Sequence, residues 1–184
     1  LYSLRVYMPY PEDNLANQIR IHKLRNNPLS DQDLIYALYQ GLAGLAHLHS
    51  MGISHGHLNP AWVTRTKIGY SILDDPLRDK NSLYNLESPL GVYLSPQHYR
   101  AAVQFKNIGY DPMKSDVFAF GLIMLECGIL KSVQPYFVKN SNQVDPEFLR
   151  AHLELLEVAN GKNLLFVSCE RKLLTEDESM RPHA

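Results

Sequence analysis

The stretch LAHLHSMGISHGHLNP, residues 45–60, marks the point where a long helix gives way to an extended loop. Before it, Ser30 stands as an N-cap with Asp33 at the third helical position, a capping-box arrangement. The spacing that predicts one apolar helix face is carried by Leu34, Leu38, Leu42, Leu45 and Leu48. Gly52 is expected to close this helix in the left-handed conformation, and the segment before Pro60 is expected to be extended.

Two patterns in this stretch mimic catalytic or metal sites. Residues 52–56 match G-x-S-x-G, but a hydrolase elbow needs a strand before the serine and a helix after it. Here a helix comes first and an extended loop follows. The nearby histidines are His47, His49, His55 and His57. Because His47 and His49 point to different helix faces and no Cys or carboxylate is interleaved, we expect structural histidines and no metal site.

Spacing and capping residues predict further elements on both sides of this stretch. They are a helix at residues 15–24, a small hairpin between residues 62 and 73, an apolar helix beginning at Asp116, a helix from Asp145-Pro146 to Asn160-Gly161, and a last helix at residues 164–174. Residues 78–94 have no period and are expected to form a loop of a length that usually carries function.

Composition excludes several classes of protein. The 184 residues suit one domain or one large lobe, and 18 Lys and Arg against 19 Asp and Glu favour no attraction to nucleic acid or anionic membrane. The longest apolar stretch, residues 117–130, is shorter than a bilayer span of about 20 residues, so we expect no membrane insertion. Cys127 and Cys169 lack CxxC companions, which predicts buried thiols and an intracellular, cytoplasmic location.

Five segments, in this order and at these spacings, resemble the C-lobe motifs of the protein kinase family. His55-Gly56-His57-Leu58-Asn59-Pro60 resembles the catalytic loop H-R-D-L-K-P, and an ungapped match puts Asp75-Pro76-Leu77 on D-F-G. The remaining matches are Tyr93-Leu94-Ser95-Pro96-Gln97 with Y-x-A-P-E, Ser115-Asp116-Val117-Phe118-Ala119-Phe120-Gly121 with S-D-V-W-S-x-G, and Met180-Arg181-Pro182 with the closing R-P.

The resemblance covers essentially the whole chain, from a hinge-like segment at residues 6–9 to Arg181. It implies the mainly α C-terminal lobe of the protein-kinase fold, α+β overall, with a small β-hairpin near the catalytic loop. Residues 1–184 are then expected to form a hinge plus C-lobe, with the N-lobe absent from the sequence and the final helix truncated.

The residues that carry chemistry in the family differ here. His57 stands at the catalytic aspartate, Asn59 at the catalytic lysine and Trp62 at the metal-binding asparagine. An imidazole could act as a base, but Asn59 brings no charge to the phosphate and an indole offers a metal no oxygen. Trp62 is instead expected to pack against the core. Asp75 keeps the carboxylate that holds magnesium in the family and is expected to be either a loop-capping acid or a vestigial nucleotide site, with Asp74 as an alternative in a shifted register.

Residues with structural roles in the family are retained. Asp116 matches the helix aspartate that holds the catalytic-loop backbone, and His55 matches the loop histidine that packs. Gln97 replaces a glutamate that pairs with the arginine of the final R-P, here Arg181. A neutral amide can still accept from a guanidinium, but without the charge-assisted part.

This combination predicts a pseudokinase: a chain that is not an enzyme, needs no cofactor, and serves as a scaffold or assembly subunit among other proteins. The alternative is a divergent Ser/Thr-type kinase with weak ATP and magnesium binding through an unseen N-lobe and Asp75.

Overall fold

The computed structural model describes residues 11–73, 92–104, 109–137, 143–161 and 163–184. Six α-helices, two 3-10 turns and three short strands lie within these ranges. The order is β1 Asp13–Asn14, α1 Leu15–Arg25, α2 Asp31–Ser50, η1 Pro60–Trp62, β2 Val63–Thr66, β3 Gly69–Ile72, α3 Pro96–Gln104, α4 Pro112–Ile129, η2 Gln134–Tyr136, α5 Pro146–Asn160 and α6 Leu164–Leu173.

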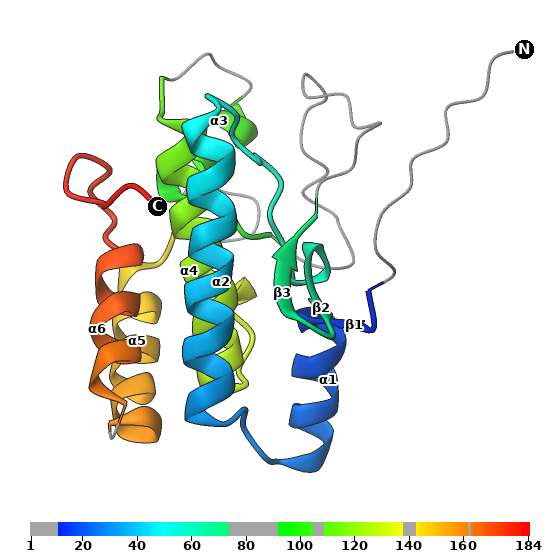
Figure 1. Cartoon of the computed structure of the whole chain (residues 1–184). Coiled ribbons are helices and arrows are strands. Elements are labelled where there is room, and N and C mark those ends of the chain that lie inside the picture. Colours follow the sequence, from blue (N-terminus) through cyan, green and yellow to red (C-terminus); the bar gives the residue numbers. More distant parts are fainter. Residues whose placement is uncertain (1–10, 74–91, 105–108, 138–142, 162) are drawn as a thin grey trace, which may run out of the picture.

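Helix α4 is the centre of the molecule. Every residue from Ser115 to Gly128 is buried, which explains why this segment is apolar on all sides. Helix α2 packs along it, α5 and α6 cover one side, and α1 with the small sheet lies on the other (Figure 1). At Gly41 a Cβ would collide with the ring of Phe120, so the close approach of α2 to α4 requires a glycine there.

The structure has the predicted capping residues at the ends of helices α2 and α5. The Ser30 side chain accepts from the Asp33 N–H at the start of α2, and Gly52 follows this helix with φ +71°. Asp145 caps α5 with Pro146 in its first turn. The prediction that the apolar helix begins at Asp116 was wrong, because Asp111 caps α4 and the helix begins at Pro112.

Strand β1 and helix α3 were missed from the sequence, as were the two 3-10 turns. Strand β1 pairs antiparallel with β2, and so makes a three-stranded sheet of the predicted hairpin. Helix α3 begins in the segment at residues 93–97, which was quoted above only for its resemblance, and continues to Gln104. Its signal was the pair Ser95-Pro96, since the Ser95 hydroxyl accepts from the His98 N–H and a proline opens the first turn.

The mainly helical architecture with a small antiparallel sheet after the loop at residues 51–59 is confirmed, and it is consistent with a kinase C-lobe. Within the described ranges no helix is long and apolar enough to cross a bilayer. Cys127 is buried and Cys169 is half-buried, and both are free thiols. The hinge-like segment at residues 6–9 lies outside the described residues, so the division into hinge and C-lobe stays a prediction.

Candidate functional site

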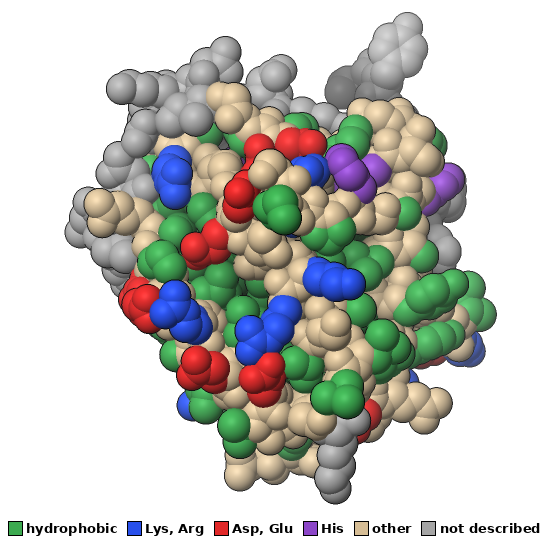
Figure 2. All heavy atoms as spheres, turned by 90° about the vertical axis from the view of Figure 1, so that its left-hand side faces the viewer, with side chains coloured by type: hydrophobic (Ala, Val, Ile, Leu, Met, Phe, Trp, Pro, Cys, Tyr) green, Lys and Arg blue, Asp and Glu red, His purple; other side chains and the backbone are tan. Residues whose placement is uncertain are grey.

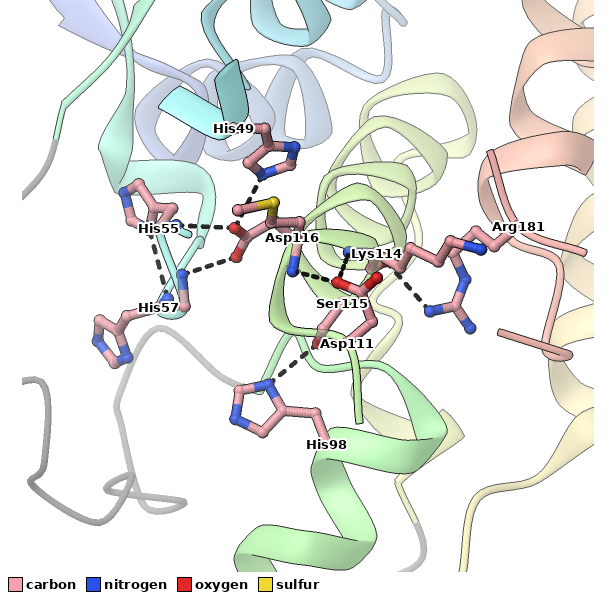
Figure 3. Close-up of polar contacts among 11 residues, drawn as sticks. His49, His55, His57, His98, Asp111, Lys114, Ser115, Asp116 and Arg181 are labelled. Carbon is pink, nitrogen blue, oxygen red and sulfur yellow. Dashed lines mark hydrogen bonds and ion pairs between the residues drawn. The ribbon is translucent and has the colours of Figure 1, made fainter. Parts of the chain in front are cut away.

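The loop after α2 is held by one buried carboxylate from α4. Asp116 is 2% exposed, and its two oxygens accept from the backbone N–H groups of His55 at 2.7 Å and Gly56 at 2.6 Å. Figure 3 shows the loop backbone meeting this side chain. Gly56 has φ +70°, a conformation that costs glycine little and other residues more. Because two backbone N–H groups donate to the same Asp116 carboxylate, they fix the course of the loop.

His49, on the last turn of α2, is a third donor to the same carboxylate. Its Nε2 lies 3.2 Å from Asp116 Oδ2, and the tautomer with the proton on Nε2 donates to this oxygen. Sequence reasoning placed His49 among structural histidines without assigning it a contact. The available signal was its position in the helical turn that leads into the loop.

His55 connects the loop to the end of the sheet. Its side chain is buried, Nε2 lies 2.9 Å from the Leu73 carbonyl oxygen, and Nδ1 accepts from the His57 N–H at 3.3 Å. The carbonyl requires a proton on Nε2, which leaves Nδ1 free to accept, so both contacts agree with one neutral tautomer. The imidazole therefore bridges residues that lie on either side of the hairpin.

The three residues at the catalytic positions have local roles in the structure. His57 is half-buried beside His55 and donates its backbone N–H to it. Asn59 is buried, and its Oδ1 accepts from the Ala61 N–H as the cap of η1. Trp62 is half-buried against the hydrophobic core, and its carbonyl accepts from the Leu73 N–H. Asn59 thus turns back on its own loop instead of reaching outward.

The described residues of this site do not fit a magnesium ion. The Asn59 amide oxygen is occupied by a backbone donor, and Trp62 has no side-chain oxygen. No group of three or more His, Cys, Asp or Glu in the described ranges could hold a metal. Asp74 and Asp75, the carboxylates on which the alternative depends, lie outside those ranges.

His98 and Ser115 form a second polar contact beneath Asp116, which sequence analysis did not find. His98 Nδ1 lies 3.0 Å from the Ser115 hydroxyl, and the imidazole stacks on Tyr110 with ring centroids 4.4 Å apart. Burial lowers the pKa of His98 to about 4, since desolvation outweighs the nearby Asp116 charge. This imidazole is therefore neutral at physiological pH.

Gln97 and Arg181 meet in the structure. Arg181 is 2% exposed, and its Nη2 donates to Gln97 Oε1 at 3.3 Å. The other guanidinium contacts are with the carbonyl oxygens of Thr175, Lys114 and Glu176 and with the ring of Phe118, whose centroid is 4.7 Å away. Burial lowers the pKa of Arg181. Carbonyl dipoles, more than the amide of Gln97, hold this cation.

The relatives of this chain among known proteins include two protein kinases, while no family model matches the chain. The stress-activated protein kinase jnk-1 of Caenorhabditis elegans is 32% identical over 125 residues, which is 67% of this chain and 25% of that protein. The meiosis induction protein kinase IME2/SME1 of Saccharomyces cerevisiae is 27% identical over 161 residues, 78% of this chain and 24% of that protein. The chain thus matches about a quarter of the length of each relative.

These relatives correct one expectation. His57, Asn59 and Trp62 were read as evidence that the chain is not an enzyme, but both relatives are protein kinases by name. Because the sequences that resemble this chain are kinases, substitutions at three positions do not show that the chain is not an enzyme. The similarity in sequence and the helical fold around the Asp116 loop together make this chain a protein kinase-like domain.

Proposed function

We propose that this kinase-like domain acts chiefly through contacts with other proteins, as a scaffold or assembly subunit of a larger intracellular complex. The proposal is carried by the Asp116 cluster, in which one buried carboxylate holds the loop by two backbone N–H groups and one imidazole. No cofactor is required for this role, and nucleic acid and membrane are not among the expected partners.

The arrangement of the loop supports binding in a specific way. Hydrogen bonds to Asp116, together with the His55 bridge, order the loop before any partner arrives. A surface that is ordered in advance loses less conformational entropy on association, which favours affinity. Asn59 caps the 3-10 turn η1 through the Ala61 N–H, and Trp62 packs against the hydrophobic core. Both side chains thus support the shape of the loop.

A second candidate is a divergent Ser/Thr-type protein kinase, and it is favoured by the names of the two relatives. Phosphoryl transfer depends on positioning and on stabilising charge. In this candidate His57 takes the proton of the substrate hydroxyl, and nucleotide binding depends on Asp75 and on an N-lobe encoded before residue 1.

Two variants of the full-length protein separate the candidates. Asp116→Asn weakens the acceptor that orders the loop, whereas His57→Ala removes only the imidazole at the base position. Each is compared with the parent by size-exclusion chromatography of the native complex and by transfer of labelled phosphate from ATP.

The scaffold proposal expects Asp116→Asn to release the protein from its complex and His57→Ala to leave the complex unchanged. Intact complex in both variants, with phosphate transfer that disappears in His57→Ala, would favour the kinase candidate and reject the scaffold. Circular dichroism of Asp116→Asn checks that the helices persist, so that loss of the complex reports on the loop.

A further inference from the structure

The ionisable side chains of helix α1 are all basic. Its basic residues are Arg20, His22, Lys23 and Arg25, and the segment Leu15–Arg25 contains no Asp or Glu. Cations in the last turn stabilise a helix by facing its dipole, which accounts for part of this pattern. The exposed Arg20 is not in that turn, so the dipole does not explain its presence.

The opposite side of the molecule is different. On the face formed by α5 and α6, basic and acidic side chains are intermixed (Figure 2). Two ion pairs account for several of them: Arg150 with Glu147 at 3.1 Å, and Arg171 with Glu157 at 2.6 Å. For a chain whose formal net charge is −1, α1 is therefore a local concentration of positive charge.

A cavity of about 360 Å³ opens beside this helix. Its walls come from α1, from η1, from the segment before α3 and from α4, and its lining residues are Ala16, Ile19, Arg20, Lys23, Leu24, Pro60, Tyr93 and Glu126. Leu24 is 76% exposed at its edge. The hollow thus combines apolar walls with basic side chains.

Glu126 is the acidic residue of this lining, and its charge is already offset. Its Oε1 accepts from Lys23 Nζ at 2.7 Å, and its Oε2 accepts from the Tyr93 hydroxyl at 3.0 Å. Within the described ranges, the hydrogen bond of Arg20 is to the neutral amide oxygen of Asn17. Neither Arg20 nor Arg25 forms an ion pair with any residue in the described part of the chain. The charge that remains for a ligand is positive.

We propose that the cavity beside α1, with Arg20 in its lining, binds an acidic segment of a partner protein that carries an apolar side chain. A carboxylate of such a segment would face Arg20, and its apolar side chain would enter the hollow next to Leu24. This inference rests on the scaffold function proposed above and names the chemistry of the partner. Contacts between exposed charges are screened by salt, so binding weakens as ionic strength rises.

The probe is a short fluorescein-labelled peptide of glutamates around a central leucine pair, titrated with the full-length protein and followed by fluorescence anisotropy. The comparison peptide has lysine in place of every glutamate. We expect the acidic peptide to bind and the basic peptide not to bind, with an affinity that falls between low and physiological ionic strength.

Matched variants locate the binding. Arg20→Glu reverses one unpaired charge at the cavity and should weaken the acidic peptide by about ten-fold, as charge reversal at a contact does. Leu24→Ser should weaken it several-fold through loss of the apolar contact. Arg150→Glu makes the same charge change on α5, on the side of the molecule away from α1 (Figure 1), and should leave binding unchanged.

Equal binding of the two peptides, or an equal loss of affinity in Arg20→Glu and Arg150→Glu, would overturn the proposal. The native complex distinguishes this failure from failure of the scaffold function. A complex that survives Arg20→Glu with its composition intact rejects the α1 site alone, whereas absence of any complex in the parent protein rejects the scaffold function itself.

Discussion

Asp116 and Glu170 are both carboxylic acids buried in the helical core, 2% and 0% exposed, but their surroundings differ. Asp116 lies at the loop end of α4 and accepts from three donors. Glu170 lies on α6, and neither of its oxygens has a hydrogen-bond partner among the described residues. Both oxygens of Asp116 thus have hydrogen-bond donors, whereas the oxygens of Glu170 have none among the described residues.

The difference shows when a buried acid helps the fold. A buried carboxyl is well accommodated where donors replace the water that it has lost, as the loop backbone and His49 do for Asp116. Burial raises the pKa of Glu170 well above its ordinary value, so the neutral acid is the form that the core can hold. Asp116 therefore holds the loop after α2 by hydrogen bonds, whereas the Glu170 carboxyl has no such contact among the described residues.

The largest expected effect is from Asp116→Ala. It would leave two backbone N–H groups and the His49 imidazole without their acceptor, and we expect a loss of about 3–5 kcal/mol in the free energy of unfolding. Denaturant titration measures the loss, and hydrogen exchange should show the His55 and Gly56 amides losing protection first. A loss below about 1 kcal/mol, the range of ordinary surface changes, would mean that Asp116 does not hold the loop.

Arg181→Ala tests a buried cation that has partners. It would remove the donors to three carbonyl oxygens and to Gln97, together with the contact to the Phe118 ring, and should destabilise the protein by about 3 kcal/mol. Thermal unfolding checks this. An unchanged or higher melting temperature would show that these acceptors find other donors and that Arg181 is not needed.

Glu170→Leu should act in the opposite direction. It replaces an unsatisfied carboxyl by an apolar side chain in a dry environment, so we expect a gain of about 2 kcal/mol at neutral pH. Glu170→Gln is the matched control, because it keeps the size and polarity but cannot ionise. A loss of stability in the leucine variant would indicate that the carboxyl has a partner.

Glu170 should also make the free energy of unfolding depend on pH. Its pKa is raised in the folded state above the ordinary value of 4.5, so the folded protein binds the proton more tightly than the unfolded chain. Its favourable contribution is complete below pH 4.5 and is lost as the pH rises toward the folded-state pKa. Both Glu170→Leu and Glu170→Gln should flatten the curve of unfolding free energy against pH above 4.5. A slope equal to that of the parent would assign this dependence to another group.

Gln97→Glu should have the smallest effect. A carboxylate would gain a charge-assisted contact with Arg181, but it would lose the amide donor that now reaches the Glu176 carbonyl at 2.7 Å. The two changes oppose each other, so we expect the free energy of unfolding to stay within about 0.5 kcal/mol by urea titration. A gain above about 1 kcal/mol would show that the ion pair outweighs the lost donor.

Much of the fold could be predicted from local signals. Ser30 and Asp145 begin helices through their own side chains, and the leucine spacing of α2 follows from helical geometry. The start of α4 was misplaced because Asp111-Pro112, an equally local signal, was passed over in favour of the motif around Asp116. Strand β1 could not be found in this way, since Asp13 and Asn14 become a strand only by pairing with residues 64 and 65.

The sequence by itself determined helices α1, α2, α5 and α6 and the caps at Ser30 and Asp145, because these depend on neighbours within a few residues. Only the tertiary structure decided that His49 shares the carboxylate of Asp116 and that Glu170 is buried without a donor among the described residues. The first of these contacts joins residues 67 positions apart. Contacts between residues so far apart in the sequence form because α2, α4 and α6 pack together. A local sequence pattern therefore cannot predict them.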